Sequence, residues 1–125
     1  MQQRTCDPAD RADVVARYVA AWGEADEAKR SALLRASCEP HLRYCDPGVF
    51  LQDRAELNAH LAELQRTFPG CRVAQDGEVE AYGSVARFRW QWSLADGTVR
   101  RRGVDFVRFS GEGRLEEVVG FFDPL

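Results

Sequence analysis

The chain has 125 residues, of which 45% are hydrophobic and 30% are charged, and its formal net charge at pH 7 is -3. This size and balance predict a single globular domain over residues 1–125, built around one core. The acidic balance disfavours a nucleic-acid surface, which requires a basic stripe. The only basic run, Arg100 to Arg102, follows an Asp-Gly turn and is interpreted as a solvated strand end.

The N-terminal stretch MQQRTCDPADRAD is polar and charged, whereas a signal peptide needs an apolar segment. No apolar run approaches the ~18 residues of a membrane-spanning helix. We therefore expect a soluble, cytoplasmic protein with neither a membrane nor a nucleic acid as partner.

The four cysteines, Cys6, Cys38, Cys45 and Cys71, form no CxxC pair and no regular spacing. They indicate reduced thiols and predict neither a disulfide framework nor a zinc site. The two histidines fit no metal-ligand spacing, and the only lysine lies in a charged stretch unsuited to Schiff-base chemistry. We expect no cofactor and no metal.

Two helices are predicted first, and they should pack as a pair. One begins after the capping residue Asp7, with Pro8 in its first turn, and ends near Gly23. The other begins after Asp26 and is stopped by Pro40.

A short strand over residues 41–46 follows, and Asp46 stands at its end before a Pro-Gly turn. A third helix is then expected between the capping residue Asp53 and Pro69. Its leucines at positions 57, 61 and 64 recur at helical spacing.

From residue 71 onward the hydrophobic period changes from helical to two. This pattern predicts strands over residues 71–82, 84–94, 98–109 and 114–123, with a bulge in the first near Asp76. Phe88, Trp90 and Trp92 share one face of the second strand. Three helices followed by a four-stranded antiparallel meander predict an α+β domain, with the helices on one face of a curved sheet that encloses a pocket.

Asp105 is the first candidate for a functional residue. At period two it shares its face with Val107 and Phe109, and a carboxyl against an apolar wall is costly unless it is paired or protonated. One interpretation places it in the pocket; the alternative pairs it with Arg87 or Arg89.

Four stretches, in this order and spacing, carry a family resemblance: VVARYVAAW, YCDP, DRAELNAHLAELQRTFPG and GVDFVRFSGEGRLEEVVGFFDP. Together they resemble the NTF2-like superfamily, in its ketosteroid-isomerase-like and SnoaL-like branch, over nearly the whole chain. The resemblance implies a cone of three N-terminal helices packed on a mostly antiparallel sheet around a pocket.

The resemblance to ketosteroid isomerases also implies roles for three residues. Asp46 would be the base that moves a proton, and Tyr18 and a protonated Asp105 would donate hydrogen bonds to the oxyanion. The alternatives are that Asp46 only forms an Asp-Pro turn and that Tyr18 is a core residue. Substrate contacts are predicted from the concave face: Trp22, Tyr44, Leu61, Phe88, Trp90, Trp92, Val107, Val118 and Phe122.

The function expected is that of a cofactor-independent isomerase or polyketide-cyclase-like enzyme acting on a small hydrophobic carbonyl compound. A limonene-epoxide-hydrolase-like reaction is ranked lower, because Gly103 occupies the place of the arginine in that family's Arg-x-Asp motif. A pocket that binds a small molecule without turnover is the third alternative. The opposite sheet face, with Phe106, Val119 and Phe121, is expected to form a two-fold homodimer.

Overall fold

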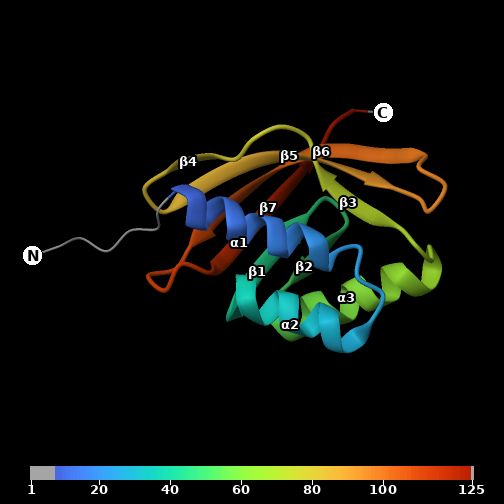
Figure 1. Ribbon diagram of the computed structural model, residues 1–125, viewed down its shortest axis with the longest axis horizontal. Coiled ribbons are helices and arrows are strands. Elements are labelled where there is room, and N and C mark those ends of the chain that lie inside the picture. Colours follow the sequence, from blue (N-terminus) through green and yellow to red (C-terminus); the bar gives the residue numbers. More distant parts are fainter. Residues whose placement is uncertain (1–7, 125) are drawn as a thin grey trace, which may run out of the picture.

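Three helices and one seven-stranded sheet make up the fold in the computed structural model, which describes residues 8–124 (Figure 1). The helices are α1 (Pro8–Ala21), α2 (Glu27–Ser37) and α3 (Arg54–Thr67). The strands are β1 (Cys38–Asp46), β2 (Val49–Leu51), β3 (Arg72–Gln75), β4 (Glu80–Tyr82), β5 (Val85–Ser93), β6 (Val99–Phe109) and β7 (Leu115–Phe122).

Two of the predicted helix caps are confirmed. The side chain of Asp26 accepts a hydrogen bond from the backbone N–H of Lys29 at 2.9 Å, and that of Asp53 accepts one from Glu56 at 2.8 Å. Such contacts satisfy N–H groups that the first helical turn leaves without a partner. The third predicted cap, Asp7, lies outside the described residues.

The end of the second helix is a correction. The helix stops at Ser37, and Pro40, predicted to end it, lies inside β1. The pairing of β1 with β7 shifts register between Cys38 and Arg43. Proline is tolerated at such an irregularity because the ladder hydrogen bonds are already interrupted there.

The strand order is β2-β1-β7-β6-β5-β3, and β4 also pairs with β5. The predicted meander is present, since β5, β6 and β7 pair antiparallel in sequence order. The sequence did not show that β1 lies parallel to β7, nor that β2 folds back on β1 as a hairpin. The stretch 71–82 is two strands rather than one, because four residues, 76–79, stand opposite only two residues of β5.

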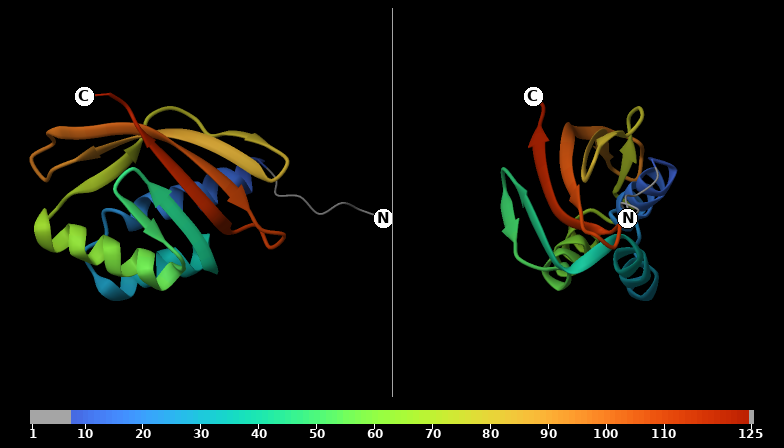
Figure 2. Two further views of the ribbon diagram at one scale, coloured as in Figure 1. Left: turned by 180° about the vertical axis from the view of Figure 1, so that it is seen from behind. Right: turned by 90° about the vertical axis from the view of Figure 1, so that its left-hand side faces the viewer.

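The sheet curves, and the helices lie on its concave side. In Figure 2 the β1–β2 hairpin bends away from β5 and β6, so that the strands and helices together enclose the interior. The core holds fully buried side chains from the helices and the strands, among them Val15, Leu34, Leu57, Leu115 and Val118. The predicted α+β cone is confirmed.

Cys38 and Cys71 are buried free thiols and Cys45 is a half-buried one, while Cys6 lies outside the described residues. None of the helices within residues 8–124 is long and apolar enough to cross a membrane.

The outer face of the sheet carries exposed aromatic side chains. Phe106 and Phe121 are 44% and 54% exposed and contact each other edge to face, with ring centroids 5.7 Å apart. In the sheet register Phe106 lies beside Val119, and Val119 lies beside Cys45, which in turn pairs with the exposed Phe50. An apolar stripe therefore crosses β6, β7, β1 and β2.

We propose that a second copy of the chain covers this stripe. Two ion pairs, Arg89 with Asp123 and Arg108 with Glu117, flank the stripe. A two-fold axis can therefore place an arginine of one copy opposite a carboxylate of the other. Light scattering at micromolar concentration should give a dimer, and Phe121→Glu should give a monomer. Ala28→Glu, which adds the same charge on the exposed side of α2, should remain a dimer. A monomeric wild type would rule the dimer out.

Candidate active site

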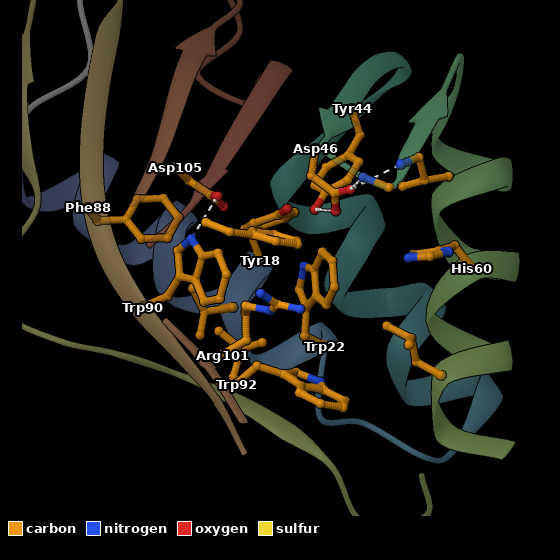
Figure 3. A pocket seen from close by; sticks show the side chains of 16 residues that line it. Tyr18, Trp22, Tyr44, Asp46, His60, Phe88, Trp90, Trp92, Arg101 and Asp105 are labelled. Atoms are coloured by element: carbon orange, nitrogen blue, oxygen red, sulfur yellow. Dashed lines mark hydrogen bonds between the residues drawn. The ribbon is translucent and has the colours of Figure 1, made fainter. Parts of the chain in front are cut away.

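The concave side of the sheet holds a cavity of about 290 Å³ that opens between α1, α3 and the strands (Figure 3). This volume is just below the ~300–1,000 Å³ typical of small-molecule sites. The lining is mostly aromatic and aliphatic, with few polar groups. It consists of Tyr18, Val19, Trp22, Tyr44, Asp46, Gly48, Val49, His60, Leu64, Val73, Phe88, Trp90, Trp92, Arg101, Asp105 and Phe122.

Tyr18 extends from α1 and is 1% exposed. Its hydroxyl is buried and forms no hydrogen bond with any of residues 8–124. Burial and the nearby Asp105 carboxyl raise the pKa of the phenol well above 10. The indole of Trp22 opposes this rise only in part and lies outside hydrogen-bond geometry. The hydroxyl therefore keeps its proton. A buried donor without a partner costs about 1–3 kcal/mol, which a ligand oxygen in the cavity would recover.

Asp105 projects from the middle of β6 and is 6% exposed. Its Oδ1 atom accepts a hydrogen bond from the indole Nε1 of Trp90 at 2.9 Å. Burial raises the pKa of this carboxyl to about 7, the Trp90 hydrogen bond opposes that rise, and the charge of Asp46 adds to it. Near neutral pH a substantial fraction of Asp105 is therefore protonated and able to donate a hydrogen bond.

The alternative prediction, that Asp105 pairs with Arg87 or Arg89, is wrong. Those arginines lie in exposed ion pairs with Glu80 and Asp123. Period two puts them on the outer face of β5, away from Asp105, which stands opposite Phe88 in the sheet.

Gly103 explains how Trp90 reaches Asp105. The two strands place Trp90 opposite Gly103, and a Cβ atom there would lie 2.5 Å from the indole ring and 2.1 Å from the backbone oxygen of Phe121. Only glycine lets the indole lie against β6 and direct its N–H at the carboxyl two residues further on.

Asp46 ends β1 and is held by three donors. Its Oδ1 atom accepts from the backbone N–H groups of Gly48 and Val49 at 2.7 and 3.0 Å, and its Oδ2 atom accepts from the hydroxyl of Tyr44 at 2.7 Å. Burial raises the pKa of Tyr44 well above 10, so this hydroxyl keeps its proton. A carboxylate has about four acceptor sites, so one remains for a proton. Asp46 thus forms the turn and still lines the cavity.

The two carboxyls and Tyr44 meet at Gly120 of β7. A Cβ atom at that position would lie 2.9 Å from Asp105 Oδ1, 3.5 Å from the Cβ atom of Asp46 and 3.8 Å from the hydroxyl oxygen of Tyr44. Figure 3 shows Asp105 with Trp90 on one side, Asp46 with Tyr44 on the other, and Tyr18 between them in that view. The structure brings the three predicted catalytic residues to one cavity.

Most of the predicted substrate contacts also line the cavity: Trp22, Tyr44, Phe88, Trp90, Trp92 and Phe122. Leu61, Val107 and Val118 do not line it, because they are buried deeper in the core. Periodicity placed them on the inward face correctly, but it carries no information about depth within the cone.

The sequence pattern did not predict that Arg101 and His60 line the cavity. The interpretation of residues 100–102 as a solvated strand end is wrong for Arg101, which lines the cavity, whereas Arg100 and Arg102 are exposed. The signal was present, because Arg101 has the same strand parity as Asp105. His60 lies on α3 with its ring 6.1 Å from Trp22, and burial lowers its pKa.

Within residues 8–124, no three His, Cys, Asp or Glu side chains gather closely enough to hold a metal ion. The chemistry available to the cavity from these residues is that of two carboxyls, two phenols, an imidazole and a guanidinium.

A cone of three helices packed on a curved sheet is the NTF2-like fold. No protein-family model and no curated protein matches the chain. Among solved structures, a proposed isomerase of the SnoaL-like family from Agrobacterium tumefaciens str. C58 is 30% identical. The alignment covers 93% of this chain and 99% of that one, with a TM-score of 0.85. The chain belongs to the SnoaL-like family.

Two further structures share the fold at lower identity. A proposed SnoaL-like polyketide cyclase from Jannaschia sp. CCS1 is 18% identical, with a TM-score of 0.74 over 98% of this chain and 92% of that one. An NTF2-like protein of unknown function from Exiguobacterium sp. 255-15 is 17% identical, with a TM-score of 0.72 over 90% of this chain and 99% of that one. Likeness at this level supports the fold alone.

Proposed function

We propose that this protein is a cofactor-independent acid/base enzyme that moves a proton beside the carbonyl group of a small hydrophobic compound. The observation that carries the proposal is the buried hydroxyl of Tyr18, which has no hydrogen-bond partner within residues 8–124. It lies near the carboxyl of Asp105, whose pKa burial raises to about 7. Two protonated donors at one end of an apolar cavity suit an oxygen that gains negative charge.

The proposed reaction begins with Asp46, whose carboxylate takes a proton from the carbon next to the carbonyl. The electron pair of that C–H bond forms a carbon–carbon double bond, and the carbonyl oxygen becomes an enolate oxygen. Tyr18 and protonated Asp105 donate hydrogen bonds to this oxygen, and preorganised donors of this kind lower such a barrier by several kcal/mol. In an isomerase Asp46 returns the proton to another carbon. In a cyclase the enolate carbon attacks the carbon of a second carbonyl, whose oxygen takes the electron pair of its π bond and then the proton that Asp46 holds.

The size of the cavity limits the substrate. A volume of about 290 Å³ with Trp22, Trp90 and Trp92 in the wall favours a compound of one or two rings. The SnoaL-like structure that is 30% identical is described as a proposed isomerase, which supports the isomerase reaction.

Gly103 weighs against the epoxide-hydrolase alternative. The arginine of that family's motif would stand there, and the backbone of Phe121 and the ring of Trp90 leave no room for a side chain.

Exchange of the protons next to a ketone tests the proposal without knowledge of the natural substrate. In D₂O at pH 6.5, a panel of small enones and bicyclic ketones such as 2-tetralone should lose those proton signals faster with the protein than without it, as measured by NMR. If the ketones bind but no exchange or conversion is accelerated, the proposed enzyme activity is ruled out, and the protein is a small-molecule-binding member of the family.

A further inference from the structure

Arg101 is the cationic side chain of the cavity that the proposed reaction does not use. It stands on β6 with the parity of Asp105, beside Trp92 of β5 in the sheet register. Figure 3 shows it reaching from the strand into the cavity. Its guanidinium carbon lies 4.9 Å from the centre of the Phe122 ring.

The guanidinium of Arg101 has no acidic partner in the part of the chain that the structure describes. Within residues 8–124 Arg101 forms neither an ion pair nor a hydrogen bond, whereas Arg87, Arg89 and Arg108 on the outer face each pair with a carboxylate. The contact with Phe122 uses the charge of the guanidinium but none of its N–H donors. A half-buried donor fork in an apolar cavity is therefore left for a ligand.

The charges around the cavity define where an anion can lie. Asp46 lies at the end where the carbonyl is placed, and the negative charge of its carboxylate repels an anionic group there. Burial lowers the pKa of His60 and so favours its neutral imidazole, whereas the guanidinium of Arg101 stays charged. Arg101 and Asp105 are four residue steps apart along the strand, so their Cα atoms are separated by roughly 13 Å.

We propose that the cavity takes a compound that carries a carboxylate at the end remote from its carbonyl, and that Arg101 binds this carboxylate. The planar guanidinium fork matches a carboxylate in a bidentate arrangement. The apolar part of the compound lies between, against Trp22 and Trp90. The inference rests on the proposed function only for the position of the carbonyl.

Binding of two matched probes tests the carboxylate site. Isothermal titration calorimetry at pH 6 compares 2-naphthoate with 2-naphthamide, which has nearly the same shape but no charge. Wild type should bind 2-naphthoate roughly ten- to a hundredfold more tightly, the range of hydrogen bonds to charged groups. Arg101→Gln should bind the two probes equally, with the affinity for 2-naphthamide unchanged.

Arg102→Gln is the matched control, because it removes the same charge from the next residue, whose side chain is exposed. It should retain the wild-type preference. Equal affinity of wild type for both probes would overturn the inference without any variant, and so would a preference that survives in Arg101→Gln. Failure of the proposed function gives a different result. If the protein prefers 2-naphthoate but accelerates no exchange in ketones, the carboxylate site is supported and the proposed enzyme activity is ruled out.

Discussion

Asp46→Asn should lower kcat at least ~100-fold on any ketone that the wild type exchanges, the range attributed to general-base catalysis. Asparagine keeps the size of the side chain but cannot accept the proton. Its amide oxygen can still accept from the backbone of Gly48 and Val49, and its amide N–H can donate to the oxygen of Tyr44. The turn should therefore persist while the base is lost.

The loss of kcat on the same ketone compares the contributions of Tyr18 and Asp105. Tyr18→Phe removes one oxyanion donor and should cost less than Asp46→Asn, because a second donor remains. Asp105→Asn should cost least at neutral pH, since an amide can still donate. Asp76→Asn, at an exposed carboxyl, should match the wild type. Full activity in Asp46→Asn, with an unchanged circular dichroism spectrum, would leave Asp46 as a turn former and remove the base from the mechanism.

Local pattern predicted most of the cone because each element carries its own signal. The alternation through Phe88, Trp90 and Trp92 needed no knowledge of neighbouring strands, and it placed the pocket wall on the correct face. The parallel pairing of β1 with β7 could not be predicted in this way, since it joins residues some seventy positions apart and no turn sets its register.

The candidate site shows a second limit of prediction from local sequence pattern. Period two assigns a face to a strand residue but not its depth, so Val107 and Val118 were expected at the pocket and lie in the core. Arg101 was assigned to the surface from its charge although its parity pointed inward. Hydrophobicity is a good guide to burial in a filled core, but it is a poor guide beside a cavity, where a polar side chain can face a ligand.

The buried carboxyl of Asp105 should make the protein less stable as the pH rises. In the folded chain its pKa is about 7, against a reference of 3.8, so between these values the folded state holds a proton that the unfolded state has lost. The contribution of Asp105 to stability therefore falls as pH increases across this interval, by about 4 kcal/mol in all, and is lowest above pH 7. Desolvation of the carboxylate is the physical origin of this cost.

Asp105→Asn removes the ionisation and can keep the hydrogen bond from the indole N–H of Trp90 through its amide oxygen. We expect the variant to be more stable than the wild type at pH 8, and its advantage to grow by roughly 2–3 kcal/mol from pH 5 to pH 8. Urea unfolding at the two pH values measures this difference. Asp76→Asn should show no such trend, because that carboxyl is exposed. An Asp105→Asn advantage that is the same at both pH values would mean that Asp105 does not titrate in this interval, and the protonated oxyanion donor would have to be abandoned with it.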